Sequence, residues 1–148
     1  MSAGKVLRVK FITRQMVESA PNTIFVFGDN MLRFGMGGQA RAMRGCSNAI
    51  GVPTKWAPGM LEKDFFADSD LENVQVICRL AASFAEISAL LMSGYDVVFP
   101  TDGLGTGLSE LPRRAPRVLL FIEGMVRHLE DAAELGVSPS FSAPTAAA

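Results

Sequence analysis

The chain has 148 residues, of which 49% are apolar and 20% charged, and its formal net charge is −1. This length predicts one domain with a substantial buried core. The near-neutral charge excludes a global field that would attract DNA or RNA, so any anion must be bound by local geometry. The chain has two cysteines, without a CxxC spacing, and one histidine. We therefore expect a reduced, cytoplasmic protein with no metal, no cofactor and no membrane segment.

The first half of the chain predicts three strands separated by short helices. Alternating apolar and basic residues at 6–12 favour a strand with one solvated face. Thr13 is a candidate N-cap for a helix over 14–19. The β-branched and aromatic run at 23–27 is typical of a strand buried on both faces. A helix is then expected from Gly37 to Gly45, followed by a short strand over 48–53.

The second half predicts a long helix, a strand and an interrupted helix. Apolar residues recur at helical spacing over 71–92, and a buried strand is expected at 97–100. The last helix is expected to break near Pro116. Strands that alternate with helices favour a mainly parallel sheet covered on both faces, which makes this an α/β domain over residues 1–135. Residues 136–148 are rich in Ser, Pro and Ala and are expected to form a flexible tail.

Two glycine-rich loops, residues 28–38 and 101–109, follow the two predicted buried strands. In such sheets ligands bind where strands end and helices begin, which is the position of both loops. Glycine lets backbone N–H groups approach a phosphate closely, and the glycines at every second position of the second loop can form an anion-binding nest. The alternative is that these glycines serve only turns and close packing. The expected ligand-binding residues are Gly28, Gly35, Gly37, Gly38 and Gln39 from the first loop, and Thr101, Gly103, Leu104, Gly105, Thr106 and Gly107 from the second.

Three side chains are candidates for chemistry on a ribose. Hydrolysis of a glycosidic bond needs a carboxylate or an oriented water near the anomeric carbon, and Asp29 and Asp102 stand at the ends of two strands. An equal alternative is that both carboxylates cap loop amides. Lys55 can pair with one of them, hold a phosphate or form a covalent adduct, and a solvated surface lysine is the alternative.

The residues Ile24 to Asn30, followed by Gly37 to Ala40, resemble the signature of the macrodomain family. Residues 98–107 are similar to the second macrodomain loop, which wraps the diphosphate and distal ribose of ADP-ribose. The resemblance spans about residues 6–130 and implies a three-layer sandwich with a mixed, mainly parallel sheet. The chain is also similar to small phage and bacterial proteins that combine a Phe-Gly-x-Asn loop, a glycine turn and a Pro-Thr-Lys segment, here residues 53–55.

The macrodomain resemblance implies roles for particular residues. Asn30 would hydrogen-bond the distal ribose, Gly37 and Gly38 would pass close to it, and residues 103–107 would hold the diphosphate. Phe11 stands where macrodomains often carry an aspartate for the adenine amine, so adenine would stack on Phe11 instead.

The expected function is binding of ADP-ribose or a related phosphate-bearing nucleotide. In its enzymatic version, an ADP-ribosyl glycohydrolase would use Asp29 or Asp102 with Asn30 and Lys55. The alternatives are a non-catalytic protein that sequesters a nucleotide and a phage structural or interaction protein. A nucleic acid is expected as a partner only if it is itself ADP-ribosylated.

Overall fold

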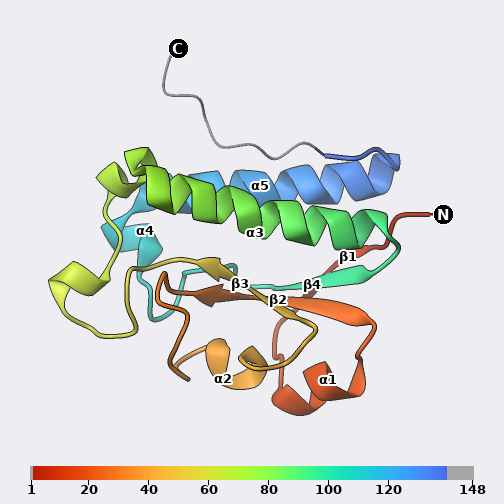
Figure 1. Ribbon diagram of the computed structural model, residues 1–148, viewed down its shortest axis with the longest axis horizontal. Helices are drawn as coiled ribbons and strands as arrows, with labels where there is room; N and C mark the ends of the chain where they lie inside the picture. The colour runs from red at the N-terminus through yellow and green to blue at the C-terminus, as the bar shows by residue number, and fades with distance from the viewer. Residues whose placement is uncertain (1, 140–148) are drawn as a thin grey trace.

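The computed structural model describes residues 2–139 and has three layers, with a sheet between two layers of helices (Figure 1). The α/β class expected from the sequence is confirmed. The strands are β1 (Val6–Val9), β2 (Thr23–Asp29), β3 (Ala49–Pro53) and β4 (Asp96–Pro100). The helices are α1 (Arg14–Ser19), α2 (Ala40–Met43), α3 (Val74–Met92), α4 (Leu111–Arg114) and α5 (Pro116–Leu135).

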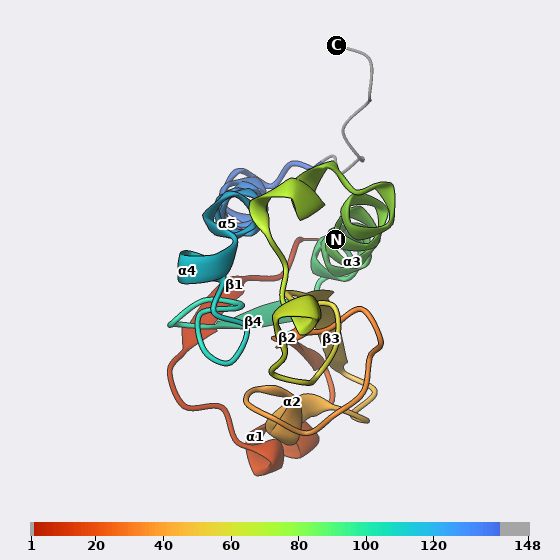
Figure 2. The same ribbon diagram turned by 90° about the vertical axis from the view of Figure 1, so that its left-hand side faces the viewer.

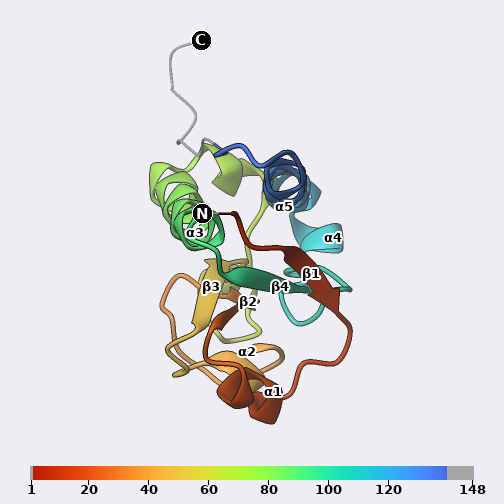
Figure 3. The ribbon, with the colours of Figure 1, turned by 90° about the vertical axis from the view of Figure 1, so that its right-hand side faces the viewer.

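The sheet has the strand order β1-β4-β2-β3, and each pair of neighbouring strands is parallel. The described sheet is therefore parallel throughout, where a mixed sheet was expected. All four strands end at the same edge, which faces the viewer in Figure 2. The strands β1 and β2 lead to α1 and α2 on one face, whereas β4, between them, leads to α4 and α5 on the other (Figures 2 and 3). Such divergent connections open crevices beside β4, where ligands bind in sheets of this kind.

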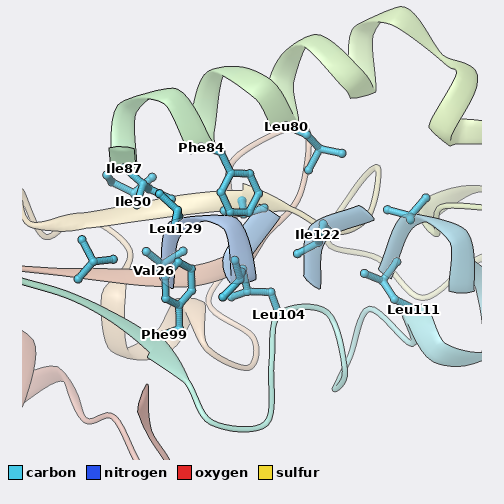
Figure 4. Close-up of a cluster of buried hydrophobic side chains, with 14 of the residues drawn as sticks. Val26, Ile50, Leu80, Phe84, Ile87, Phe99, Leu104, Leu111, Ile122 and Leu129 are labelled. Carbon is cyan, nitrogen blue, oxygen red and sulfur yellow. The ribbon is translucent and has the colours of Figure 1, made fainter. Parts of the chain in front are cut away.

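The main core lies between the sheet and the helices α3 and α5 (Figure 4). Val26 and Phe84 are completely buried there, and Phe99 and Ile122 are 1% exposed. A second cluster packs on the opposite face of the sheet, beneath α1 and α2, and includes Phe25 and Phe27 of the same strand β2. Burial on both faces explains why β2 is continuously apolar in sequence.

Helix α3 has 19 residues and a mean hydropathy of 1.6, so by length and composition alone it could cross a membrane, and within residues 2–139 it is the one helix of that kind. Half of it is buried inside the protein. Leu80, Phe84, Ile87 and Leu91 are completely buried, and they form part of the core that covers the sheet. Packing in the core therefore accounts for the apolar character of this helix.

The elements begin and end close to the expected positions, with local exceptions. Strand β1 stops at Val9, because its partner β4 ends opposite, at Pro100. Thr13 caps α1 as expected, accepting a hydrogen bond from the Met16 amide at 3.2 Å. Helix α3 starts at residue 74 and not at 71, because the Asn73 side chain caps it and residues 68–72 form a 3₁₀ turn. Helix α5 ends at residue 135, and the part of the expected tail from residue 140 onward lies outside the described residues.

Candidate functional site

The two glycine-rich loops meet at one cavity of about 130 Å³, in the crevice between the ends of β2 and β4. Most of the residues expected at the site line this cavity: Gly28, Asp29, Asn30, Gly35, Gly37, Gly38, Gln39, Lys55, Gly105 and Gly107. The cavity also has lining residues that the sequence did not single out, namely Phe34, Ala40, Arg44, Pro58, Leu108 and Ser109.

Gln39 joins the first loop to the second. Its Oε1 accepts a hydrogen bond from the Gly28 amide at 2.7 Å, and its Nε2 donates to the carbonyl oxygen of Gly103 at 3.2 Å. The backbones approach closely beside it, because a Cβ placed on Gly28 would lie 3.3 Å from the amide nitrogen of Gly105. The Gln39 side chain makes no capping bond to α2. It acts as a bridge between the loops, a role that sequence reasoning did not assign.

Thr54 makes a second connection, between the end of β2 and the second loop. This residue is completely buried, and its amide and hydroxyl both donate to the carbonyl oxygen of Asp29, at 2.8 and 3.0 Å. Its hydroxyl oxygen also lies 2.6 Å from that of Ser109 in the second loop. The middle residue of the Pro-Thr-Lys segment therefore fastens the end of β2 to the loop that follows β4.

Several backbone N–H groups at the cavity remain available to a ligand. Within residues 2–139, the amides of Gly37, Gly38, Gly105 and Gly107 make no hydrogen bond. Gly38 and Gly105 have φ angles of 56° and 81°, the left-handed conformation that contributes to anion-binding nests. The amide of Gly103 differs, because it donates to the Pro100 carbonyl oxygen at 3.0 Å. Helix α2 spans only four residues, so its dipole adds little to the positive character of these amides.

Lys55 places a positive charge at the same cavity. It is only 5% exposed, and its Nζ donates to the Gly59 carbonyl oxygen at 2.6 Å and lies 4.3 Å from the centre of the Phe65 ring. Burial lowers the pKa of the Lys55 ammonium below its usual range; nearby Asp64 and Glu110 act in the opposite direction. An ammonium has three N–H donors. One bonds Gly59 and a second contacts the Sδ of Met60 at 3.7 Å, which leaves one for an anion.

Asp29 is engaged in an ion pair. Its carboxylate accepts from the guanidinium of Arg44, in contacts that include one of 3.3 Å from Nη1 to Oδ2, and from the Asn30 amide at 2.8 Å. The Nε of Arg44 donates to the Gly35 carbonyl oxygen at 2.7 Å. Arg44 therefore clamps the first loop against the end of β2. Asp29, which carries the one carboxylate among the described lining residues, is part of this clamp.

Asn30 also holds the first loop together. Its Nδ2 donates to the Phe34 carbonyl oxygen at 2.8 Å, and its Oδ1 accepts from the Leu32 amide at 3.0 Å. Both ends of this side chain are thus occupied within the loop, whereas the macrodomain resemblance implied a bond to a ribose.

The start of the second loop faces a different cavity, of about 190 Å³, on the β1 side of β4. Thr101, Asp102, Gly103 and Leu104 line that cavity together with residues of β1 and α5. Asp102 is exposed there, and the Leu104 side chain points into the core (Figure 4). The structure therefore does not bring Asp102 into the cavity that holds Asp29 and Lys55.

Two further residues lie apart from both cavities. Thr106 is exposed, and its hydroxyl donates to the Asp102 carbonyl oxygen at 2.8 Å. Phe11 is 77% exposed and lines neither cavity. The position of Phe11 gives no support to the adenine contact that the macrodomain resemblance implied for it.

Comparisons with known proteins give one match. No curated protein and no solved structure matches the chain. A family model matches residues 7–125, which include the sheet except for Val6 at its start, both glycine-rich loops and Lys55. The chain therefore belongs to the family of unknown function DUF7831.

Proposed function

We propose that this protein binds a phosphate-bearing nucleotide, such as ADP-ribose, with a phosphate in the cavity between the two loops. The observation that carries the proposal is that Gly37, Gly38, Gly105 and Gly107, whose amides make no hydrogen bond within residues 2–139, line one cavity together with Lys55. Backbone amides and a cation are the groups that proteins use to bind phosphate. The resemblance to macrodomains supports the choice of ADP-ribose as the first ligand to test.

The geometry favours binding without hydrolysis. A glycosidase needs one carboxylic acid and one carboxylate, or an activated water, on either side of the bond that breaks. Asp29 is paired with Arg44, and Asp102 lies at the other cavity. We therefore propose that the bound nucleotide is held intact, which agrees with a sequestering role better than with a glycohydrolase.

Titration calorimetry with ADP-ribose, NAD, AMP and inorganic phosphate tests this function. We expect ADP-ribose to bind, and we expect Lys55→Met to weaken binding by about tenfold or more, because a charge-assisted hydrogen bond is lost. Lys63→Met is the matched control, since Lys63 is an exposed lysine outside the cavity and should leave the affinity unchanged. Absence of binding to every ligand at millimolar concentration would refute the proposal. Recovery of ribose or a shortened nucleotide after incubation would refute the non-hydrolytic version.

The affinity should also depend on pH through Lys55. A bound phosphate favours the charged ammonium, so binding raises the pKa of Lys55, which burial lowers in the free protein. By linkage, the affinity is highest below the pKa that Lys55 has in the free protein, and it falls as pH rises through that pKa. Because burial lowers this pKa, the fall starts at a lower pH than it would for a solvated lysine. Calorimetry with ADP-ribose from neutral pH to about pH 10 measures the effect, because its diphosphate carries no proton that titrates in this range. The fall should disappear in Lys55→Arg, whose guanidinium stays protonated.

A further inference from the structure

The mouth of the cavity is bordered by large apolar side chains that are half exposed. Phe34 from the first loop is 55% exposed and Leu108 from the second is 53% exposed, and both line the cavity. Pro58, from the loop after β3, lines the cavity as well. Single exposed apolar residues are ordinary, but a group of them at the mouth of a cavity marks a contact surface.

The backbone near these side chains is held in place by contacts within the protein. The Phe34 carbonyl oxygen accepts the 2.8 Å bond from Asn30, and a Cβ on Gly35 would lie 3.0 Å from Pro58. Leu108 packs across to the first loop, because its Cδ1 would lie 3.1 Å from a Cβ on Gly37. The backbone that carries the apolar border is therefore held by contacts within the protein, which lowers the entropy cost of binding against it.

The size of the cavity decides which part of a ligand meets this border. Its volume of about 130 Å³ is well below the roughly 300 to 1,000 Å³ of pockets that enclose a whole drug-sized ligand. A cavity of this size takes a phosphate and cannot enclose a whole nucleotide, so we expect the rest of the ligand to extend to the mouth. There the ligand meets the ring of Phe34 and the side chain of Leu108, which suit a flat aromatic group.

We infer that Phe34 and Leu108 form a shelf on which the base of the nucleotide stacks, so that the site selects nucleotides over sugar phosphates and inorganic phosphate. This inference rests on the proposed function and assigns the base-binding role to Phe34 instead of Phe11. Stacking on an aromatic side chain tolerates every base and favours the larger purine faces.

A comparison of AMP with ribose 5-phosphate tests the shelf, because the two ligands differ by the base alone. We expect AMP to bind the wild-type protein about tenfold tighter or more, and Phe34→Ala to remove about tenfold from AMP affinity while leaving ribose 5-phosphate unchanged. Phe34→Tyr should keep the preference. Leu32→Ala is the control, since Leu32 is 59% exposed in the same loop and does not line the cavity.

Fluorescence of a base analogue reports stacking of the base directly, whereas a purely structural effect of Phe34 would change only the affinity. The 5′-phosphate of 2-aminopurine riboside should lose fluorescence on binding to the wild-type protein and keep it on binding to Phe34→Ala. Equal affinities for AMP and ribose 5-phosphate, or equal losses of both in Phe34→Ala, would overturn the shelf and leave phosphate binding intact. Failure of the wild-type protein to bind any of the phosphate ligands would overturn the proposed function and the shelf together.

Discussion

Replacement of Asp29 by alanine is expected to lower the free energy of unfolding by about 3 kcal/mol, because it leaves a largely buried guanidinium without its partner. The side chains of Asp29 and Arg44 are 7% and 19% exposed. Their ion pair joins the end of β2 to the end of α2, and Arg44 also bonds Gly35 in the first loop. Urea denaturation followed by circular dichroism measures the change. Asp102→Ala is the matched control: it removes an exposed aspartate just after β4 and should leave the free energy of unfolding unchanged.

A double-mutant cycle separates the ion pair from other effects of the substitution. Asp29→Ala and Arg44→Met should each destabilise the protein, and the double variant should cost less than their sum by about 0.5 to 3 kcal/mol. Additive losses would show that the two side chains act independently and would contradict the clamp.

The same variants decide what Asp29 contributes to function. As part of the clamp, Asp29 supports ligand binding by holding the first loop, so Asp29→Ala and Arg44→Met should weaken nucleotide binding to a similar degree. A catalytic carboxylate gives a different pattern, in which Asp29→Ala keeps stability and binding and loses only turnover. Calorimetry with ADP-ribose and a turnover assay on the same samples distinguish the two.

The sequence predicted the elements of the fold well where local patterns determine them. The apolar run before Gly28 forms a central strand. A strand buried on both faces needs apolar residues at successive positions, so it can be recognised from its own sequence. Thr13 capped its helix because a cap depends on residues a few positions apart. The strand order and the parallel pairing of all the strands depend on contacts between distant segments, and the sequence pattern favoured only a mainly parallel sheet.

The site was predicted in part, for a physical reason. Parallel strands end at one edge, so the sequence indicated that both loops gather there. It did not indicate that the second loop crosses from one side of β4 to the other between Leu104 and Gly105, which separates Asp102 from Lys55. Arg44 was missed as well, because its pairing with Asp29 depends on how the short helix α2 lies against the sheet and no local motif records it.

Among the glycines of the second loop, Gly105 is the one whose replacement by alanine should lower the free energy of unfolding most. Its φ of 81° costs an alanine about 1 to 2 kcal/mol. The new Cβ would also collide with Leu111, whose Cγ would lie 2.8 Å away, and press on the Cβ of Thr54 at 3.1 Å. Leu111 and Thr54 are completely buried and have no room to yield, so overpacking adds about 1 to 3 kcal/mol.

Two neighbouring glycines separate these two costs. Gly103→Ala meets Thr106 only at an ordinary 3.4 Å and has a φ of 92°, so it should show the backbone cost alone. Gly107→Ala meets nothing within 4 Å and has no positive φ, so its stability should be unchanged or slightly raised. We therefore expect unfolding free energies in the order Gly107→Ala, Gly103→Ala, Gly105→Ala, from highest to lowest, in urea titrations. Equal stabilities of the Gly103 and Gly105 variants would mean that the second loop does not pack on Leu111 and Thr54. In that case the second loop would not be held in the position that places its amides at the cavity.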